Sequence, residues 1–219
     1  MVPFKMFNMR RFFPALAGVV LVASAMEPAH AAEPSFDCAK AESAVEKLIC
    51  GNTQLAELDR ETARLFDLAK DEPHLTPLQR RELVTLQGDW LKQREDCTKA
   101  QDPHQCAAEA MITRIVRLRQ SYPDVRQRDR EGISLGPFAA HCEGFKGRID
   151  VSYVNSNPAF AYVAEPTGSL LLKQTMSGSG ARYDASYPAG KAELWTKGNG
   201  AQIALPGRSA MTCSLDVPK

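Results

Sequence analysis

The sequence has little excess charge of either sign. Its 219 residues include 27 Lys and Arg residues against 26 Asp and Glu residues. A nearly neutral chain has no general electrostatic attraction to nucleic acid or to anionic lipid. No basic stripe interleaved with aromatic residues is present either. We therefore expect no nucleic-acid partner.

The motifs of the common metal sites and hydrolases are also missing. There is no C-x-x-C pair, and His74, His104 and His141 are not placed at metal-ligand spacing. Ser179 lacks the G-x-S-x-G frame of a nucleophile elbow, and Gly190-Lys191 is not followed by the Ser or Thr of a phosphate loop. We expect a protein that is not an enzyme and that holds no metal and no cofactor.

Long apolar runs are confined to the N-terminus. Lys5, Arg10 and Arg11 precede an apolar stretch over 12–26, and an A-x-A site follows it at 29–31. This layout predicts a secretory signal peptide over 1–31, since the run is too short to span a bilayer comfortably. The Arg10-Arg11 pair leaves a twin-arginine signal open. No cysteine lies near the cleavage site, so we expect a periplasmic protein without a stable membrane anchor.

Cleavage after Ala31 changes the charge balance slightly. It removes three basic residues and one acidic residue, Glu27, and leaves 24 basic and 25 acidic residues, a net charge of −1. All six cysteines remain in the mature chain. An even number of cysteines in an exported protein indicates disulfides, and the spacing suggests the sequential pairs Cys38–Cys50, Cys97–Cys106 and Cys142–Cys213.

The first half of the mature chain has helical periodicity. We predict a short helix after Cys38 and longer helices from about Thr53, from Pro77 and from Pro103, with Thr76 and Asp102 as N-caps. Apolar residues recur at intervals of three and four, which gives each long helix one apolar face. In the helix after Pro77 we expect this face to contain Leu83, Leu86, Trp90 and Leu91.

The second half changes to a period of two. A charged stretch with Pro and Gly over 123–136 is typical of a linker. The short alternating segments RIDVSYVN, AFAYVAE, SLLLKQTM, AELWTK, AQIALP and AMTCSLDV follow it. They predict a small antiparallel barrel or sandwich, whose ends Cys142 and Cys213 would tie together. The stretch 177–200 is rich in glycine and poor in aliphatic residues, so we expect it to present a surface and not to form core.

The sequence of this second half resembles the MliC/PliC family of periplasmic or membrane-bound inhibitors of C-type lysozyme. The resemblance rests on CEGFKGRIDVSYVN, SGSGARYD, LWTKG and the closing MTCSL, and it covers about 137–219. The first half, with FDCAKAESAVEKLICGNTQLAELDRETARLF and DWLKQREDC, resembles the LprI-type N-terminal domain. Together they imply an α+β protein with a disulfide-stapled helical domain at 32–122, a linker at 123–136 and a small antiparallel β-barrel at 137–219.

The MliC/PliC resemblance also implies a mechanism. In that family a serine of an S-G-A-x-Y motif and a lysine of a T-K-G motif insert into the active-site cleft of lysozyme. The implied lysozyme-binding residues are Ser179, Gly180, Ala181, Arg182 and Tyr183, and Trp195, Thr196, Lys197 and Gly198. Ser177 stands in a similar S-G context and is an alternative to Ser179. The partner implied is a C-type lysozyme.

Other interpretations of these residues stay open. The glycines fit hairpin turns, Tyr183 and Trp195 fit a barrel core, and Arg182 fits an ion pair with Asp184. A rival function is a periplasmic binding or envelope-structural module without lysozyme inhibition. The oligomeric state does not follow from the sequence.

Overall fold

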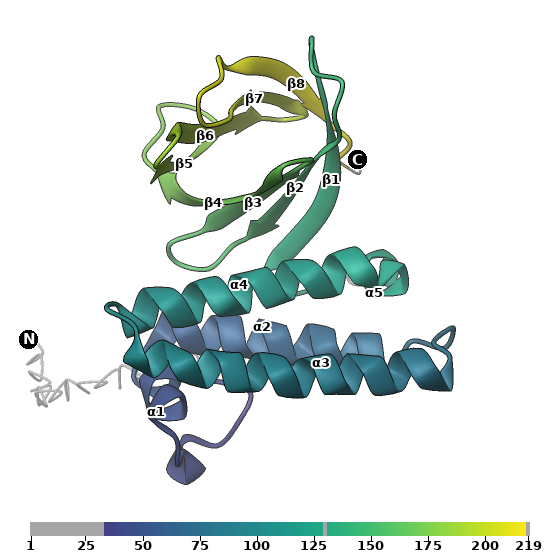
Figure 1. Ribbon diagram of the computed structural model, residues 1–219, viewed down its shortest axis with the longest axis vertical. Coiled ribbons are helices and arrows are strands. Elements are labelled where there is room, and N and C mark those ends of the chain that lie inside the picture. The colour runs from purple at the N-terminus through teal and green to yellow at the C-terminus, as the bar shows by residue number, and fades with distance from the viewer. Residues whose placement is uncertain (1–32, 129–130, 218–219) are drawn as a thin grey trace, which may run out of the picture. The chain divides into compact units, whose positions relative to one another are not determined.

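The structure of the protein is a computed structural model that describes residues 33–128 and 131–217. The expected signal peptide at 1–31 lies outside the described residues. A helical part, residues 33–128, precedes a barrel, residues 134–215 (Figure 1). The helical elements are η1 (Cys38–Lys40), α1 (Ala44–Cys50), α2 (Thr53–Lys70), α3 (Pro77–Glu95), η2 (Asp96–Lys99), α4 (Pro103–Ser121) and α5 (Pro123–Arg128).

The three long helices begin at the residues expected from the sequence. The Thr76 side chain accepts a hydrogen bond from Gln79 N, and the Gln79 side chain accepts one from Thr76 N, which completes a capping box before Pro77. The Asp102 carboxylate accepts a hydrogen bond from Gln105 N at 3.0 Å at the start of α4. These local signals fix where α3 and α4 begin, because they satisfy backbone donors that have no partner within the helix.

The helical core is formed mainly by α2 and α4. The apolar stripes expected on both are buried, including Leu55, Leu58 and Leu65. The apolar face expected on α3 is only partly buried. Leu83 is fully buried, but Leu86 and Leu91 are 48% and 40% exposed. A narrow strip of α3 packs against the core that α2 and α4 form, so most of the α3 surface faces solvent.

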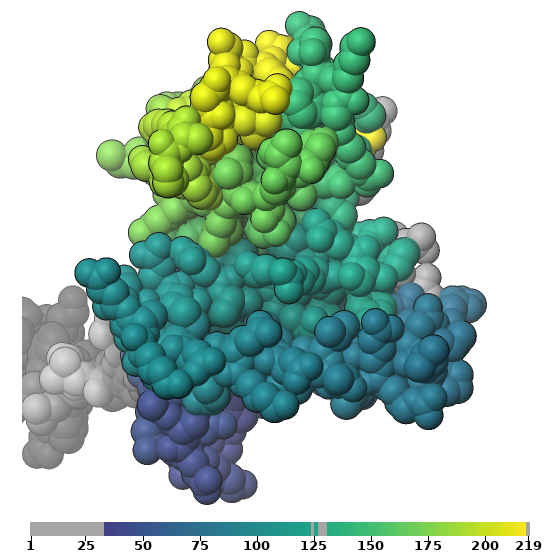
Figure 2. Space-filling view, in the orientation of Figure 1, coloured from purple at the N-terminus to yellow at the C-terminus, as the bar shows by residue number. Residues whose placement is uncertain are grey.

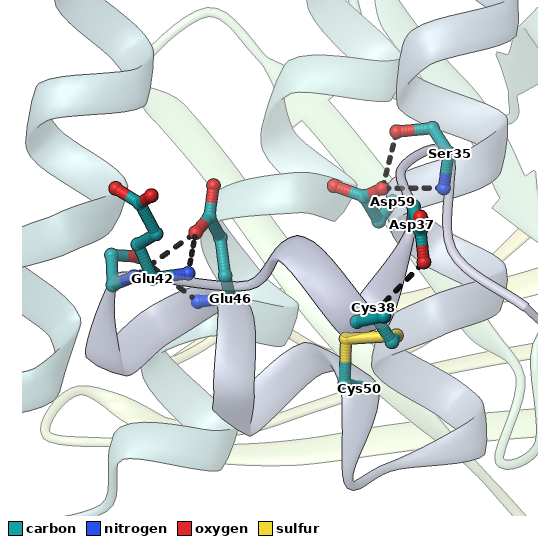
Figure 3. Close-up of a disulfide and its surroundings, with 9 residues drawn as sticks. Ser35, Asp37, Cys38, Glu42, Glu46, Cys50 and Asp59 are labelled. Carbon is teal, nitrogen blue, oxygen red and sulfur yellow. Dashed lines mark hydrogen bonds between the residues drawn. A yellow bond between two sulfur atoms is a disulfide. The ribbon is translucent and has the colours of Figure 1, made fainter.

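A buried ion pair joins the helices near the first disulfide. Arg94 Nη1 donates to Asp59 Oδ1 at 2.7 Å, and both side chains are less than 10% exposed. The other oxygen of Asp59 accepts hydrogen bonds from Ser35 N and Ser35 Oγ (Figure 3). This network ties the chain before Cys38 to α2 and α3. A carboxylate this deeply buried needs such partners, because an unpaired buried charge is strongly destabilising.

The barrel is closed and wholly antiparallel, and its strands follow chain order from β1 to β8. The strands are β1 (Ser134–Cys142), β2 (Ile149–Val154), β3 (Phe160–Glu165), β4 (Gly168–Thr175), β5 (Ala181–Tyr187), β6 (Gly190–Lys197), β7 (Gly200–Ala204) and β8 (Met211–Leu215). Pairing of β1 with β8 closes the ring and places Cys142 directly opposite Cys213. The antiparallel barrel predicted from the alternating segments is confirmed.

Two strands were not anticipated. Strand β1 begins at Ser134, inside the expected linker, and β5 lies within the glycine-rich stretch 177–200. Tyr183, Ala192 and Leu194 from that stretch are buried in the barrel core. The expectation that this stretch forms no core was therefore wrong. Its few apolar side chains alternate on two paired strands, which is enough to line the interior of a small barrel.

The helical part and the barrel contact each other within the compact unit Ala31–Lys219. Residues 123–136 hold α5 and the start of β1, and Val125 is fully buried. Ser134 Oγ donates to Glu61, and Arg119 Nε donates to Gly136 O at 2.9 Å. In the space-filling view the teal atoms of the helices meet the green atoms of the barrel (Figure 2). Residues 123–128 and 134–136 of this stretch thus form parts of α5 and β1.

All three expected disulfides form. The S–S distances are 2.07 Å for Cys38–Cys50, 2.03 Å for Cys97–Cys106 and 2.02 Å for Cys142–Cys213. The third bridge has a sequence separation of 71 and stabilises the folded state by about 4 kcal/mol in the chain-entropy account. Across residues 33–128 and 131–217, none of the helices has the length and apolar character that a bilayer crossing requires.

Candidate functional site

The two sequence motifs lie side by side at one end of the barrel. Strands β5 and β6 form a hairpin whose register pairs Ala181 with Thr196 and Arg182 with Trp195. The β4–β5 loop, residues 176–180, therefore ends next to the β6–β7 turn, residues 198–199. Ser179 and Lys197 are 18 positions apart in the sequence, and the hairpin brings their segments together. We call the two segments, 176–180 and 195–200, the paired loops.

A glycine makes the close approach of the paired loops possible. Gly180 has a φ of +68°, and a Cβ atom there would lie 2.2 Å from the carbonyl oxygen of Thr196. The same Cβ would lie 3.3 Å from Lys197 Cβ. Any larger residue at this position must push one loop away from the other, and it must also adopt a strained backbone conformation.

Trp195 holds the serine loop in place. Its indole Nε1 donates a hydrogen bond to the carbonyl of Ser179 at 2.9 Å, and Ser177 Oγ donates to the same carbonyl at 2.7 Å. The Ser177 hydroxyl proton is thus used inside the loop. The Ser179 hydroxyl makes no hydrogen bond within the described part of the chain, and Ser179 is exposed. Of the two serines, Ser179 has the hydroxyl that is free to donate to a partner.

Lys197 presents its ammonium group to solvent. The residue is exposed, and its Nζ atom has no hydrogen bond or ion pair among the residues that the structure describes. Lys197 pairs with Gly200 across a two-residue turn, and Gly198 at the first turn position has a φ of +59°. A positive φ at that position is typical of tight hairpin turns. The lysine is therefore placed at the end of a short, well-defined turn.

Tyr183 and Thr196 face the barrel interior and not the surface. Tyr183 is only 4% exposed, and its ring centroid lies 5.7 Å from that of Tyr153. Burial raises the pKa of Tyr153 to about 12, and a hydrogen bond with Thr196 acts in the opposite direction. This interior cluster supports the strands beneath the paired loops. Tyr183 can stabilise the site, but its side chain is not available for contact with a partner.

Arg182 belongs to a network of charges on the outer wall of the barrel. Its Nη2 donates to Glu193 Oε2, and its Nε lies 3.9 Å from Asp184 Oδ2. Lys191 Nζ is 3.2 Å from the same oxygen of Asp184. The guanidinium is therefore already paired, as the ion-pair interpretation of the sequence allowed. Ala181 opens β5 and packs partly against the barrel core.

Sequence reasoning missed Met176. This residue follows directly on β4, opens the β4–β5 loop, and is 97% exposed. A methionine with almost no contact to its own chain is unusual, because burial of its side chain is favourable by about 1.5–3 kcal/mol. The available signal was an apolar residue immediately before the S-G-S-G run. The paired loops thus present a methionine, a serine hydroxyl, an indole and an ammonium group.

The local charge of this surface is positive. The segments 176–180 and 195–200 contain Lys197 and no Asp or Glu. A protruding cation with a hydroxyl donor beside it suits a cleft that carries carboxylates. Among residues 33–128 and 131–217, no group of three or more His, Cys, Asp or Glu side chains is arranged to hold a metal.

Comparison with known families agrees with this geometry. Residues 141–212 match the family model described as membrane-bound lysozyme-inhibitor of c-type lysozyme (MliC). This match lies within the barrel and covers most of it. The matched range contains strands β2 to β7 and both paired loops, so the match includes the whole of the candidate site.

The chain is also similar to proteins that contain more than this domain. Lipoprotein LprI of Mycobacterium tuberculosis and that of Mycobacterium bovis are each 27% identical over 171 residues, which is 75% of this chain and 80% of theirs. An alignment of that length exceeds the MliC domain, so the similarity extends into the helical part. No solved structure matches the chain.

Proposed function

We propose that the protein inhibits C-type lysozyme by inserting the paired loops into the active-site cleft of that enzyme. One observation carries the proposal: the β5–β6 register places Ser179 and Lys197 in adjacent exposed loops, and Trp195 and Gly180 fix those loops against each other. Both side chains lack partners within the described residues. They can therefore bind groups of another protein without breaking contacts of their own.

The chemistry of the target explains how such an insertion would block it. Lysozyme uses two carboxyl groups, of which one is a general acid with a raised pKa and the other stays ionised. The ammonium of Lys197 is attracted to the ionised carboxylate. It also favours ionisation of the general acid, which then cannot protonate the leaving oxygen. The Ser179 hydroxyl donates one more hydrogen bond to the same pair.

These two contacts need a surrounding interface. A hydrogen bond to a charged group contributes about 1.5–3 kcal/mol, so two of them give weak binding by themselves. Met176 and Trp195 supply apolar contact area beside them, and both are at the same end of the barrel. With a net charge of −1 on the mature chain, long-range attraction to a basic lysozyme is small. We infer that shape and local contacts dominate the affinity.

The decisive test is inhibition of cell-wall lysis by a C-type lysozyme. The oxidised mature protein is titrated beside Lys197→Ala, Ser179→Ala and the control Lys146→Ala, which removes an exposed lysine from the β1–β2 connection at the opposite end of the barrel. We expect the wild type and the control to block lysis, and Lys197→Ala to be at least tenfold weaker. Undiminished inhibition by Lys197→Ala would reject the insertion mechanism. A folded wild type without any effect would reject the function.

The cellular location belongs to the same proposal. We infer export by the signal peptide over 1–31 and a periplasmic inhibitor without enzymatic activity. The mycobacterial relatives are called lipoproteins, whereas this chain has no cysteine near the expected cleavage site. Mass spectrometry of the protein recovered from the periplasm is expected to show an unmodified N-terminus at Ala32. A lipid-modified or uncleaved N-terminus would contradict this part of the proposal.

A further inference from the structure

A groove between α3 and α4 has features that lysozyme inhibition does not explain. Its volume is about 660 Å³, which is within the range of ligand sites. The groove is lined on its apolar side by Leu86 and Trp90 of α3 and by Ala110 and Tyr122 at α4. Leu86 is 48% exposed and Trp90 is only partly buried, so apolar surface is open to solvent there.

Arg114 lines the same groove and is buried without a counter-ion. Its side chain is 7% exposed, and its Nε donates to Gln87 Oε1 at 2.9 Å. The terminal Nη2 atom is buried and has no hydrogen-bond partner in the described part of the chain. Burial lowers the pKa of Arg114, and the neighbouring charge of Arg117 adds to this effect. A buried guanidinium that lacks a carboxylate is costly for the folded state.

A second arginine reinforces the positive charge. Arg117 follows one turn later on α4, lines the groove, is exposed, and makes no ion pair with any described side chain. The acidic residues at the groove are engaged elsewhere: Asp89 pairs with Lys92 at 3.2 Å, and Glu109 accepts a hydrogen bond from Gln105 at 2.8 Å. Two guanidinium groups therefore lie beside open apolar surface, and neither forms an ion pair with Asp89 or Glu109, the two carboxylates that line the groove.

We propose that this groove binds an acidic peptide segment of a partner protein, with a carboxylate on Arg114 and Arg117 and an apolar side chain against Trp90 and Leu86. Planar guanidinium groups bind carboxylates through paired N–H donors, and the bond is stronger where water is excluded. The apolar lining selects a peptide over a simple anion. This site lies on the helical part, so the proposal does not depend on lysozyme inhibition by the paired loops.

The test uses Trp90 as the reporter. The chain has two tryptophans, so Trp195→Phe leaves Trp90 as the single fluorophore in the full-length mature protein. The probes are the peptide acetyl-Leu-Glu-Leu-amide, its Gln analogue acetyl-Leu-Gln-Leu-amide, and sodium acetate. We expect a saturable fluorescence change with the Glu peptide and at least tenfold weaker binding of the Gln analogue. Equal binding of both peptides, or no response up to millimolar peptide, would overturn the proposal. So would acetate binding as tightly as the Glu peptide, since that would show a simple anion site.

Variants separate the groove from a general charge effect. Each variant is made in the Trp195→Phe background. We expect peptide binding to weaken at least tenfold in Arg114→Met and in Arg117→Gln. The control is Arg81→Gln, which removes an exposed arginine of α3 outside the groove and should retain binding. We also expect Arg114→Met to keep or raise the melting temperature, because it removes a buried charge that has no counter-ion. If Arg114→Met does not fold, the exposed Arg117→Gln decides the question. Equal loss of peptide binding in Arg81→Gln would reject the site.

A lysozyme assay separates this proposal from the proposed function. With Trp195 intact, we expect Arg117→Gln to inhibit lysozyme as the wild type does, so failure of either proposal can be told from failure of the other.

Discussion

The indole of Trp195 holds the carbonyl of Ser179 through a hydrogen bond of 2.9 Å, and this bond joins the two loops of the candidate site. Ser179 lies in the β4–β5 loop, and Trp195 lies on β6. Because the bond is made to the backbone of Ser179, it orients the loop and leaves the Ser179 hydroxyl free. We therefore propose that Trp195 positions the loop, in addition to the contact with lysozyme proposed above.

Replacement of Trp195 by Phe tests the positioning role. Trp195→Phe keeps a ring on the outer wall but removes the N–H donor. A neutral hydrogen bond contributes about 0.5–1.5 kcal/mol, so we expect inhibition of lysozyme to weaken by about threefold to tenfold. The melting temperature should change by only a few degrees. An inhibition constant equal to that of the wild type would show that the bond does not organise the site.

Gly180 gives a second test of the loop pair. In Gly180→Ala the new Cβ meets the carbonyl of Thr196 and the backbone has a positive φ, so we expect a loss of about 1–3 kcal/mol in the free energy of unfolding. Inhibition should fall strongly as the loops separate. Gly178→Ala is the matched control, because a Cβ at Gly178 meets nothing within 4 Å. Similar effects of the two substitutions would contradict the close-approach argument.

Met176 should matter for binding and not for folding. It is 97% exposed, so Met176→Ala removes almost no packing from the folded protein. If the side chain is buried by a partner, its loss costs about 1.5–3 kcal/mol, or about tenfold to a hundredfold in affinity. The control is Leu78→Ala on α3, which removes another exposed apolar side chain, 67% exposed. Calorimetric titration with lysozyme measures both, and an unchanged affinity of Met176→Ala would remove Met176 from the interface.

The buried tyrosine predicts a loss of stability in alkali. The pKa of Tyr153 is about 12 in the folded state against an ordinary value of 10.0. Stability from this group is complete below pH 10 and is lost as the pH rises from 10 towards 12, because the unfolded chain ionises first. The full effect is about 2–3 kcal/mol. We expect the fall in unfolding free energy between pH 9 and 11.5, measured with urea, to be smaller in Tyr153→Phe. An identical fall in both proteins would contradict the assignment.

The buried pair of Asp59 and Arg94 is expected to act as one unit. Breaking such a pair leaves an uncompensated buried charge, so Arg94→Met should lower the free energy of unfolding by about 3–5 kcal/mol. The double variant Asp59→Asn with Arg94→Met should recover part of this loss. Urea denaturation of Arg94→Met, Asp59→Asn, the double variant and the wild type gives the coupling energy. Strictly additive losses would show that the pair is not coupled.

The helical part could be predicted well because its signals are local. The caps at Thr76 and Asp102 and the prolines after them determine where α3 and α4 begin, and an i, i+3, i+4 stripe determines which face of α2 is buried. How much of α3 would be covered depends on the other helices. For this reason the exposure of Leu86 and Leu91 on the apolar face of α3, and the groove beside them, could not be predicted.

The barrel could be predicted from the sequence less completely than the helical part. The alternating segments indicated an antiparallel closed or layered sheet, but β5 was hidden because its polar outer residues resemble a loop in the sequence. The contact of the barrel with the helices was also hidden. The core of the helical part includes Val154 and packs against Phe160 and Leu171 of the barrel, so point variants are better tests of the helical part than its deletion.

The sequence by itself determined most of the elements: the helix starts, the periodicity of six of the eight strands, the three disulfides and the residue types of the two motifs. These depend on neighbours within a few positions or on a limited number of cysteine pairings. Only the tertiary structure decided which of the motif residues are available. Strand register turned Tyr183 and Thr196 inward, joined Arg182 to Glu193, and left Ser179, Lys197 and Met176 exposed. Register depends on every strand pair around the closed barrel at once, and no short stretch of sequence contains that information.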